Sequence, residues 1–561
     1  MSDRTAVRRL LPLAFCLLLF LALSVPQLSL PGLHYDEAKE AGLNAMQLVT
    51  GQPVTAFRDA TIGIGRWRLP LMVQDYIGAL NVLLAVPFLA IGGLNVSALR
   101  ALPICIAAMT LVMTAGVARR LGGTLAATVA VFLLAVNPTF IFWSRQGIFV
   151  TNLTALLFMA SLWTGLRWWR DRRPADLWWT AFLWGLGLYA KLLFVWAIGA
   201  LAAVALVAWG AEQRQAGATA KRQIGTFLIA LGCFLLPLSP LIVFNLQTGG
   251  TLISIFSNLG QSYYGVNNRA YLPNLWTRIG QLVTLLRGDH LWYLGEVYAN
   301  RWAPWLAAGG VGAAVALWAW PRRSAVGRGT ALLPFVLLAL VVAQSAFTVS
   351  DLFITHYALI VPLVPLGAGL TAGRLFERLA SPPGRPAAPQ ATSSPRRVLL
   401  GRAALGLLLA AALFLWAATD LANTLRYHRI LAISGGYASH SDAIYHLAAY
   451  LKEREPSAPL ALDWGIDAPV RFLTAGRVNP VEVFGYERLD GPDAGFADRV
   501  APFLANPNNL YVAHTGEFVI FRGRVEALEA LAAGRGQRLA EAARFGERSG
   551  RPLFIVYQTA Q

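Results

Sequence analysis

Long apolar runs separated by short basic segments constrain this chain more than any other feature. One run extends from Leu10 to Leu30, another from Val398 to Ala418, and several between them reach a similar length. A helix needs about 20 predominantly apolar residues to cross the hydrocarbon core of a bilayer. Only 14% of the 561 residues are charged and 56% are hydrophobic, whereas about 25% of the residues in a soluble domain are charged. The sequence therefore predicts a polytopic α-helical membrane protein.

The first apolar run follows the basic segment Arg4 to Arg9, as the core of a signal peptide would. It is longer than a typical signal-peptide core and lacks a small-residue cleavage site, so we expect a retained membrane anchor. The three cysteines, Cys16, Cys105 and Cys233, all lie inside apolar runs. Their placement excludes a disulfide framework and a cysteine-based zinc site.

Basic residues indicate the orientation of the chain. The formal net charge is +18, but the Lys and Arg residues gather between apolar runs, as in cytoplasmic loops. This pattern argues against a nucleic-acid partner. Six clusters follow it: Arg4 to Arg9, Arg119-Arg120, Arg167 to Arg173, Arg214 to Arg222, Arg322 to Arg328, and Arg374 to Arg402. If all are cytoplasmic, the segments between them cross in pairs. That gives about eleven spans, a cytoplasmic N-terminus and an outer C-terminus, with twelve or thirteen spans left open.

Two segments need separate interpretation. Tyr76 to Leu94 is apolar enough to span, but a full crossing there would place Arg119-Arg120 outside. We therefore expect it to be a juxtamembrane or re-entrant element of the first outer loop. The stretch Leu177 to Trp209 is expected to form two short spans that bend outward near Tyr189 to Lys191.

Composition divides the chain into a transmembrane catalytic domain at residues 1–420, with an outer loop at 31–98, and a soluble domain at 421–561. Pro, Ser and Ala dominate residues 376–397, which is typical of a flexible linker, here on the cytoplasmic side. After residue 420, short strand-like runs alternate with helical stretches, which predicts a small extracytoplasmic α/β domain. The expected strands are Leu460 to Asp463, Leu510 to Ala513, Phe518 to Phe521 and Leu553 to Tyr557, and the expected helices include Asp442 to Lys452 and Val525 to Ala533.

The segment Leu33-His-Tyr-Asp-Glu-Ala38 directly follows the first apolar run. Asp36 and Glu37 are candidate catalytic carboxylates, and His34 and Tyr35 are candidate substrate-binding residues. The same carboxylates lie where a helix from Asp36 to about Val49 would begin, and acidic residues stabilise a helix N-terminus. His34 could likewise be a local hydrogen-bonding residue. Adjacent helical residues point about 100° apart, so Asp36 and Glu37 need not share a role.

Cations on the outer side run against the positive-inside bias. Lys191 lies in an apolar stretch, where a lysine costs about 2.5–3.5 kcal/mol at a helix centre unless it snorkels or meets an anion. Arg145, Arg66 and Arg68 are further candidates for binding a donor phosphate, although the last two could be interfacial anchors. Other outward-facing segments supply four more candidate substrate-binding residues: Asn152, Arg269, His356 and Tyr357.

A carboxylate facing several cations at a membrane surface is typical of transfer from a lipid-linked phosphate. The cations would stabilise the departing phosphate, and Asp36 would take the proton from an incoming hydroxyl as general base. Glu37 is expected to orient the loop or to help hold a divalent metal such as Mg²⁺ or Mn²⁺. The sequence has no GxxxxGK[ST], HExxH or GxSxG motif. This disfavours nucleotide hydrolysis, a helical zinc protease and an α/β-hydrolase mechanism.

The order of these motifs resembles the GT-C membrane glycosyltransferases, in the branch with the protein O-mannosyltransferases and the lipid A aminoarabinose transferase. The matching segments, within about residues 10–375, are Asp36 to Ala38, Ser97 to Pro103, Asn137 to Arg145, Gly185 to Lys191, Asn245 to Gly250 and Thr355 to Pro362. The resemblance implies a polyprenyl-phosphate sugar donor, an inverting hexosyl or pentosyl transfer, and Asp36 as the catalytic carboxylate.

One segment departs from the family pattern. The family often has a second acidic residue after the Ser-Arg motif, whereas this chain has Val150-Thr151-Asn152 there. The departure argues against a metal held by two acidic loops. It also leaves open whether the acceptor is a protein, a lipid or a polysaccharide.

A transporter or flippase of a lipid-linked substrate is the alternative function. Transporters carry intramembrane charges on several helices and broken helices from inverted repeats. Here the ionisable residues lie mainly at the outer ends of the apolar runs and no repeat is visible, which favours the enzyme. A third interpretation is a scaffold or sensor that works through its outer domain. It would leave Asp36, Lys191 and His356 without a shared purpose.

Overall fold

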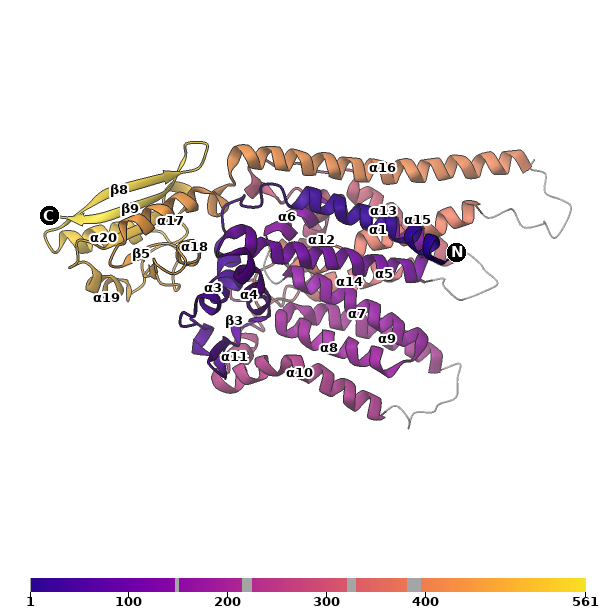
Figure 1. The fold of residues 1–561 in the computed structure, drawn as a ribbon, viewed down its shortest axis with the longest axis horizontal. Helices are drawn as coiled ribbons and strands as arrows, with labels where there is room; N and C mark the ends of the chain where they lie inside the picture. Colours follow the sequence, from indigo (N-terminus) through magenta and orange to yellow (C-terminus); the bar gives the residue numbers. More distant parts are fainter. Residues whose placement is uncertain (1, 147–150, 214–223, 320–328, 381–394) are drawn as a thin grey trace.

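The protein is described by a computed structural model over residues 2–146, 151–213, 224–319, 329–380 and 395–561. Most helices run side by side along the long axis of the molecule, and the C-terminal domain lies at one end of them (Figure 1). The N-terminus lies at the opposite end (Figure 1). The helices of this bundle are α1 (Ser2–Ser24), α5 (Val96–Val136), α6 (Pro138–Gln146), α7 (Thr151–Asp171), α8 (Pro174–Ala190), α9 (Val195–Gln213), α10 (Ile224–Thr248), α12 (Tyr271–Arg287), α13 (Ala303–Ala319), α14 (Leu333–Ser345), α15 (Leu363–Ala380) and α16 (Pro395–Ser434).

Several of these helices are suited to a membrane. Within the described residues, five helical segments are long and apolar enough to cross one, and a sixth arises if α6 and α7 form one bent span. Four shorter apolar helices accompany them: Leu10–Ser24, Leu80–Gly92, Ala303–Ala319 and Leu333–Ser345. The helical character is thus confirmed and the apolar helices fit a polytopic membrane protein, while the count of about eleven spans and the orientation of the termini stay predictions.

Small residues allow α5 and α15 to pack closely. A Cβ added at Gly369 would lie 2.5 Å from the carbonyl oxygen of Ala126, and one added at Gly373 would lie 2.9 Å from the Ala126 side chain. Such contacts between small residues are typical of helices packed in a membrane. They form part of a continuous apolar core that runs through the bundle.

The first outer loop is helical where the sequence predicts a helix. Helical conformation runs from Tyr35 to Thr50 through α2 (Tyr35–Glu37), a π-helical turn η1 (Ala38–Gly42) and α3 (Leu43–Thr50). Two short hairpins follow, made of β1 (Thr61–Ile64) with β2 (Trp67–Pro70) and β3 (Met72–Gln74) with β4 (Ile77–Gly78). The expected juxtamembrane element is α4 (Leu80–Gly92), which at 13 residues is shorter than a full crossing requires.

The predicted bend at Lys191 is confirmed as a break between α8 and α9. Lys191 has extended backbone angles, and a 3-10 turn η3 (Leu192–Phe194) leads into α9. The Leu192 N–H donates to the carbonyl of Tyr76 at 3.0 Å, and Lys191 forms an isolated β-bridge with Ile77. The break is therefore tied to the first outer loop.

The last part of the chain folds around a mixed five-stranded sheet with the order β6-β5-β7-β9-β8. Strands β5 and β6, and β5 and β7, are parallel, whereas β7–β9 and β9–β8 are antiparallel. The strands are β5 (Pro459–Ala461), β6 (Val481–Glu482), β7 (Leu510–His514), β8 (Arg538–Gly546) and β9 (Pro552–Ala560), with helices α17 (Ala443–Arg454), α18 (Asp467–Leu473), α19 (Phe496–Val500) and α20 (Arg524–Ala533). The predicted α/β character of this region agrees with these elements.

Three predictions about the secondary structure and domain limits are corrected. The domain boundary at residue 420 falls inside α16, which continues to Ser434, and the expected strand Phe518 to Phe521 is not a strand. Instead the Ile520 and Phe521 N–H groups donate to the buried Asp463 carboxylate. Helices α15 and α16 occupy both ends of the predicted 376–397 linker, and its middle, 381–394, lies outside the described residues.

Three further short elements lie between the longer helices. They are α11 (Gly250–Ser257), η4 (Trp292–Leu294) and η5 (Ile354–Ile360). In Figure 1, α3, α4, α11 and β3 lie at the end of the bundle that carries the C-terminal domain. Segments that are far apart in the sequence therefore meet at one end of the helices.

Candidate active site

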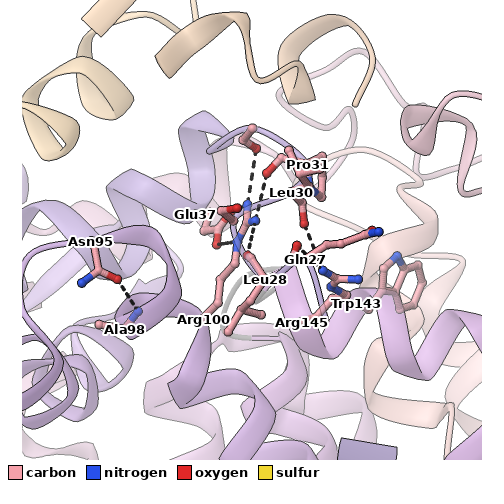
Figure 2. A network of polar contacts seen from close by, with 12 residues as sticks. Gln27, Leu28, Leu30, Pro31, Glu37, Asn95, Ala98, Arg100, Trp143 and Arg145 are labelled. Atoms are coloured by element: carbon pink, nitrogen blue, oxygen red, sulfur yellow. Dashed lines mark hydrogen bonds and ion pairs between the residues drawn. The ribbon is translucent and has the colours of Figure 1, made fainter. Parts of the chain in front are cut away.

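Two buried arginines donate hydrogen bonds to backbone carbonyls of the segment that joins α1 to α2, the helix that contains Asp36 (Figure 2). Arg100, near the start of α5, donates to three of them, the carbonyls of Leu28, Pro31 and Gly32. Arg145, at the end of α6, donates to three others, those of Pro26, Gln27 and Leu30. Both guanidinium groups therefore fix the course of the chain just before the catalytic candidates.

Arg100 also binds Glu37. Its Nε lies 2.7 Å from Glu37 Oε1 and its Nη2 lies 2.9 Å from Oε2, and both side chains are buried. A bidentate pair of this kind fixes geometry as well as charge. Of the roles expected for Glu37, these contacts support orientation of the loop. The assignment of Glu37 as a catalytic residue or metal ligand is corrected, because both carboxylate oxygens are held by Arg100.

The assignment of Arg145 to a donor phosphate is also corrected. Its side chain is fully buried, and its Nη1 lies 3.2 Å from Nδ1 of His428 on α16. Together with its three carbonyl partners, this contact makes Arg145 a structural residue. The guanidinium group of Arg145 stabilises the turn after α1. No contact of Arg145 with Asp36 is present among the described residues.

Asp36 differs from the other carboxylates on its helix by its accessibility. The Asp36 side chain is 26% exposed and the Glu37 side chain 5% exposed, while Glu40 is 4% exposed as a residue. All three line one small cavity against Asn81 of α4 and the start of α5. Asp36 is therefore the carboxylate of this group that an incoming substrate can reach.

Glu40 is a site residue that sequence reasoning missed. It lies in η1, and its negative charge, followed by that of Asp36, acts on the Lys191 ammonium. Lys191 is itself buried, and its Nζ donates to Thr151 Oγ1 at 3.2 Å. The signal was present in the sequence, because residues four apart share one face of a helix and Glu40 follows Asp36 by four positions. The predicted anion near Lys191 therefore comes from the protein itself as well as from any substrate.

Two tyrosines, Tyr76 and Tyr264, lie close enough to Asp36 for its negative charge to act on them. Burial first, then Tyr264 and the carboxylates of Glu40 and Asp36, raise the pKa of Tyr76. Burial first, then Tyr263 and Asp36, also raise the pKa of Tyr264. Both phenols stay protonated at neutral pH, so each can donate an O–H hydrogen bond beside Asp36.

His356 is another of the predicted substrate-binding residues, and it too is near Lys191. It is buried on η5, its Nδ1 is 3.5 Å from Arg278 Nη2, and the charges of Lys191 and Arg278 both act on its ring. Tyr357, the next residue in the chain and also predicted to bind substrate, is fully buried, and its hydroxyl lies 3.1 Å from Ser345 Oγ. The assignment of Tyr357 to substrate binding is corrected to a packing role. Arg278 was not among the predicted residues.

The remaining predicted residues do not converge on Asp36. Arg66 and Arg68 are exposed at the β1–β2 hairpin, and Arg269 is exposed before α12. The buried Asn152 donates to the carbonyl of Trp143 at 2.7 Å, so its assignment to substrate binding is corrected to holding α7 against α6. No hydrogen bond or ion pair joins any of the four to Asp36 within the described residues.

His34 and Tyr35 contact the C-terminal domain instead of an open cleft. The Tyr35 hydroxyl lies 3.2 Å from Glu482 Oε1, and its ring lies 4.6 Å from that of Trp464. The His34 ring stacks on His440 at 4.2 Å. These contacts replace the substrate-binding roles predicted for both residues.

A metal ion held by protein side chains does not fit this site. Over the ranges that the structure describes, no three His, Cys, Asp or Glu side chains are grouped closely enough to hold one. Glu37, the predicted ligand, is occupied by Arg100. The arrangement instead offers one accessible carboxylate, a buried lysine and two phenol donors.

Known proteins share part of the sequence pattern and the overall fold of this chain. Residues 82–243 match the family of dolichyl-phosphate-mannose-protein mannosyltransferases, whereas no curated protein sequence matches the chain. The fold is similar to that of ArnT from Cupriavidus metallidurans in the apo state, with a TM-score of 0.59, 14% identity, and coverage of 99% of this chain and 98% of that chain. ArnT bound to undecaprenyl phosphate gives a TM-score of 0.56 at the same identity and coverage.

The archaeal oligosaccharyltransferase AglB from Archaeoglobus fulgidus, in complex with an inhibitory peptide and a dolichol-phosphate, is a more distant match. It gives a TM-score of 0.49 and 12% identity over 91% of this chain and 70% of that chain. The family match over residues 82–243 and the fold shared with ArnT over nearly the whole chain confirm the predicted resemblance to the GT-C membrane glycosyltransferases.

Proposed function

We propose that this protein transfers a sugar from a polyprenyl-phosphate donor to an acceptor on the outer face of the cell membrane. The observation that carries the proposal is the position of Asp36, an accessible carboxylate whose charge acts on the buried Lys191. In ArnT, the similar fold binds undecaprenyl phosphate, which supports a lipid phosphate as donor here.

Asp36 acts as general base in the proposed reaction. The acceptor hydroxyl loses its proton to the Asp36 carboxylate as its oxygen bonds to the anomeric carbon of the sugar. The bond between that carbon and the phosphate oxygen breaks, and the polyprenyl phosphate leaves with the electron pair. Attack opposite the leaving group inverts the anomeric configuration of the hexosyl or pentosyl group.

Lys191 stabilises the leaving phosphate. A buried ammonium acts in a medium of low dielectric constant, where its attraction for developing negative charge is stronger than in water. Its position at the break between α8 and α9 places it next to the first outer loop. Tyr76 and Tyr264 supply additional O–H donors for phosphate or sugar oxygens.

The test is mass spectrometry of surface glycans and glycoproteins from a deletion strain that is complemented with wild-type protein or Asp36→Asn. Asparagine keeps the volume of the side chain but is not a base, so we expect the Asp36→Asn strain to lack the same product as the deletion strain. Asp59→Asn is the matched control, since Asp59 is exposed in the same outer loop, and it should restore the product. Full restoration by Asp36→Asn at equal expression would refute the role of Asp36.

The same experiment separates the alternative transporter or flippase. A transporter would need no base at position 36, so Asp36→Asn would then leave the product unchanged. Loss of product together with accumulation of the polyprenyl-phosphate sugar in the membrane favours the transferase. The product lost from the deletion strain also identifies the acceptor as a protein, a lipid or a polysaccharide.

A further inference from the structure

The placement of Asp36 depends on a histidine two residues before it. His34 has an extended backbone and caps α2, and its Nδ1 accepts a hydrogen bond from the Asp36 N–H at 3.2 Å. A ring nitrogen accepts a hydrogen bond only when it carries no proton. The orientation of Asp36 is therefore tied to the position of the His34 ring and to its neutral state.

The His34 ring belongs to a column of three stacked rings from three distant segments. His34 and His440 stack with centroids 4.2 Å apart and ring planes 14° apart, and His440 and Tyr293 stack at 4.4 Å and 27°. Trp464 contacts the edge of His34 at 5.8 Å. The column thus joins the first outer loop to η4 and to the C-terminal domain.

The backbone around this column is closely packed. A Cβ added at Gly32 would lie 2.1 Å from the carbonyl oxygen of Ser441, so only glycine fits where the first loop passes the C-terminal domain. The Tyr445 hydroxyl donates to the carbonyl of Ser29 at 2.6 Å. The C-terminal domain therefore contacts the chain just before His34 at two points.

We infer that His440 of the C-terminal domain is a positioning residue for Asp36 and acts through the ring of His34. The Nδ1 of His440 is buried and has no hydrogen-bond partner among the described residues, so the stacked ring, and not a hydrogen bond from that atom, is what His440 contributes. This inference rests on the proposed function, since the orientation of Asp36 matters to turnover only if Asp36 is the base.

The charges around His34 determine what happens when the column is disrupted. Burial lowers the pKa of His34, while Asp36 and Glu37 on its own segment raise it. Facing it from the C-terminal domain is His440, whose own pKa is lowered by burial, then by His34 and Arg100. Tyr293 is the titratable group beyond His440. If solvent enters beside His34, the burial effect weakens and the two carboxylates favour its protonated form.

The experiment uses the purified full-length protein in lipid nanodiscs. The donor probe is the polyprenyl-phosphate sugar fraction extracted from the producing cells, and release of polyprenyl phosphate is measured from pH 5 to 9. A second readout is hydrogen exchange of the Asp36 amide, followed by mass spectrometry. The variants are His34→Phe, His440→Ala and His440→Phe, with His446→Ala as control because His446 is exposed on α17.

His34→Phe keeps the stack but removes the acceptor for the Asp36 N–H. We expect its kcat to fall about 10- to 100-fold, the scale of a misplaced catalytic group, with the donor KM within about twofold and faster exchange of the Asp36 amide. His440→Ala should lower kcat similarly and move the acidic limb of the pH profile towards about 6.5, the ordinary pKa of histidine. His440→Phe should retain most of kcat and the wild-type profile, and His446→Ala should match wild type.

Two results would overturn the inference. One is a wild-type kcat for His34→Phe, and the other is equal behaviour of His440→Phe and His440→Ala. If His440→Ala does not fold, the kcat values of His34→Phe and His440→Phe still test the inference, because only the first is expected to fall. Normal turnover by Asp36→Asn would instead defeat the proposed function, whereas an inactive Asp36→Asn beside a fully active His34→Phe would defeat only the positioning role.

Discussion

Glu37 and Arg100 are joined by two hydrogen bonds of 2.7 and 2.9 Å in the interior of the protein. Adjacent residues on a helix point about 100° apart. Because Glu37 points toward Arg100 on α5, the neighbouring Asp36 points away from Arg100. Asp36 is the more exposed of the two, with 26% of its side chain accessible against 5% for Glu37. The two acidic residues of the motif thus have separate roles.

Removing either partner of this pair should destabilise the protein strongly. A charge left alone in a buried site destabilises by about 3–5 kcal/mol, and Arg100 also holds three backbone carbonyls. We therefore expect Arg100→Met to lower the midpoint of thermal unfolding of the purified protein more than Glu37→Gln does. The double variant should be less destabilised than the sum of the two. Additive losses would show that the pair makes no joint contribution.

Lys191→Met should weaken binding of the lipid donor more than binding of the acceptor. Methionine preserves the apolar stem but removes the charge proposed to meet the phosphate. We expect the donor KM to rise about tenfold or more, the scale of one lost charge-assisted hydrogen bond, with a smaller change in the acceptor KM. Arg66→Met, at an exposed arginine of the β1–β2 hairpin, is the control. Equal losses for both substrates would argue against a phosphate contact.

The charges of Glu40 and Lys191 should be coupled in stability. Glu40→Gln removes the negative charge that acts most strongly on Lys191, and it leaves an ammonium in a buried site. We expect Glu40→Gln to lower the free energy of unfolding, and Glu40→Gln combined with Lys191→Met to recover part of the loss. Chemical denaturation of the four proteins measures this coupling. A double variant no more stable than Glu40→Gln would mean that Lys191 does not depend on Glu40.

Local patterns predicted much of the membrane part of the fold. Apolar runs located α10, α13 and the first half of α16, and the interrupted run at Lys191 located the break between α8 and α9. Residues whose partners are distant in sequence were harder to interpret. Arg100 was noted only as part of a motif, because its partner Glu37 lies 63 positions away in the sequence. The carbonyl partners of Arg145 lie more than 100 positions away from it.

The site shows the same limit. Asp36 and Lys191 could be selected because a carboxylate at a membrane exit and a lysine in an apolar run are locally unusual. The contact of Tyr35 with Glu482 spans 447 positions, so nothing near Tyr35 in the sequence indicates it. The segment expected to be a strand instead begins at the end of a 3-10 turn, Gly516–Phe518. The N–H groups of Ile520 and Phe521 that follow donate to Asp463, which lies far upstream.

A half-buried acid pair, Asp467 and Glu482, at the contact between Tyr35 and the C-terminal domain should make stability depend on pH. Burial first, then the neighbouring Glu482, raise the pKa of Asp467 to about 8. In the unfolded chain the pKa returns to about 3.9. Between these values the folded state binds the proton and the unfolded state does not. Because the unfolded state then binds fewer protons, the free energy of unfolding falls as the pH rises through this window.

Asp467→Asn should remove this dependence. An asparagine amide can donate to Glu482 at every pH, as protonated Asp467 does at low pH, so the midpoint of thermal unfolding should change less between pH 5 and 8 than in the wild type. Above about pH 8, where Asp467 has lost its proton, the variant should be the more stable protein. Asp498→Asn, at an exposed acid on α19, serves as the control and should keep the wild-type slope. An Asp467→Asn protein whose melting temperature follows pH as steeply as the wild type would show that Asp467 is already ionised in the folded state.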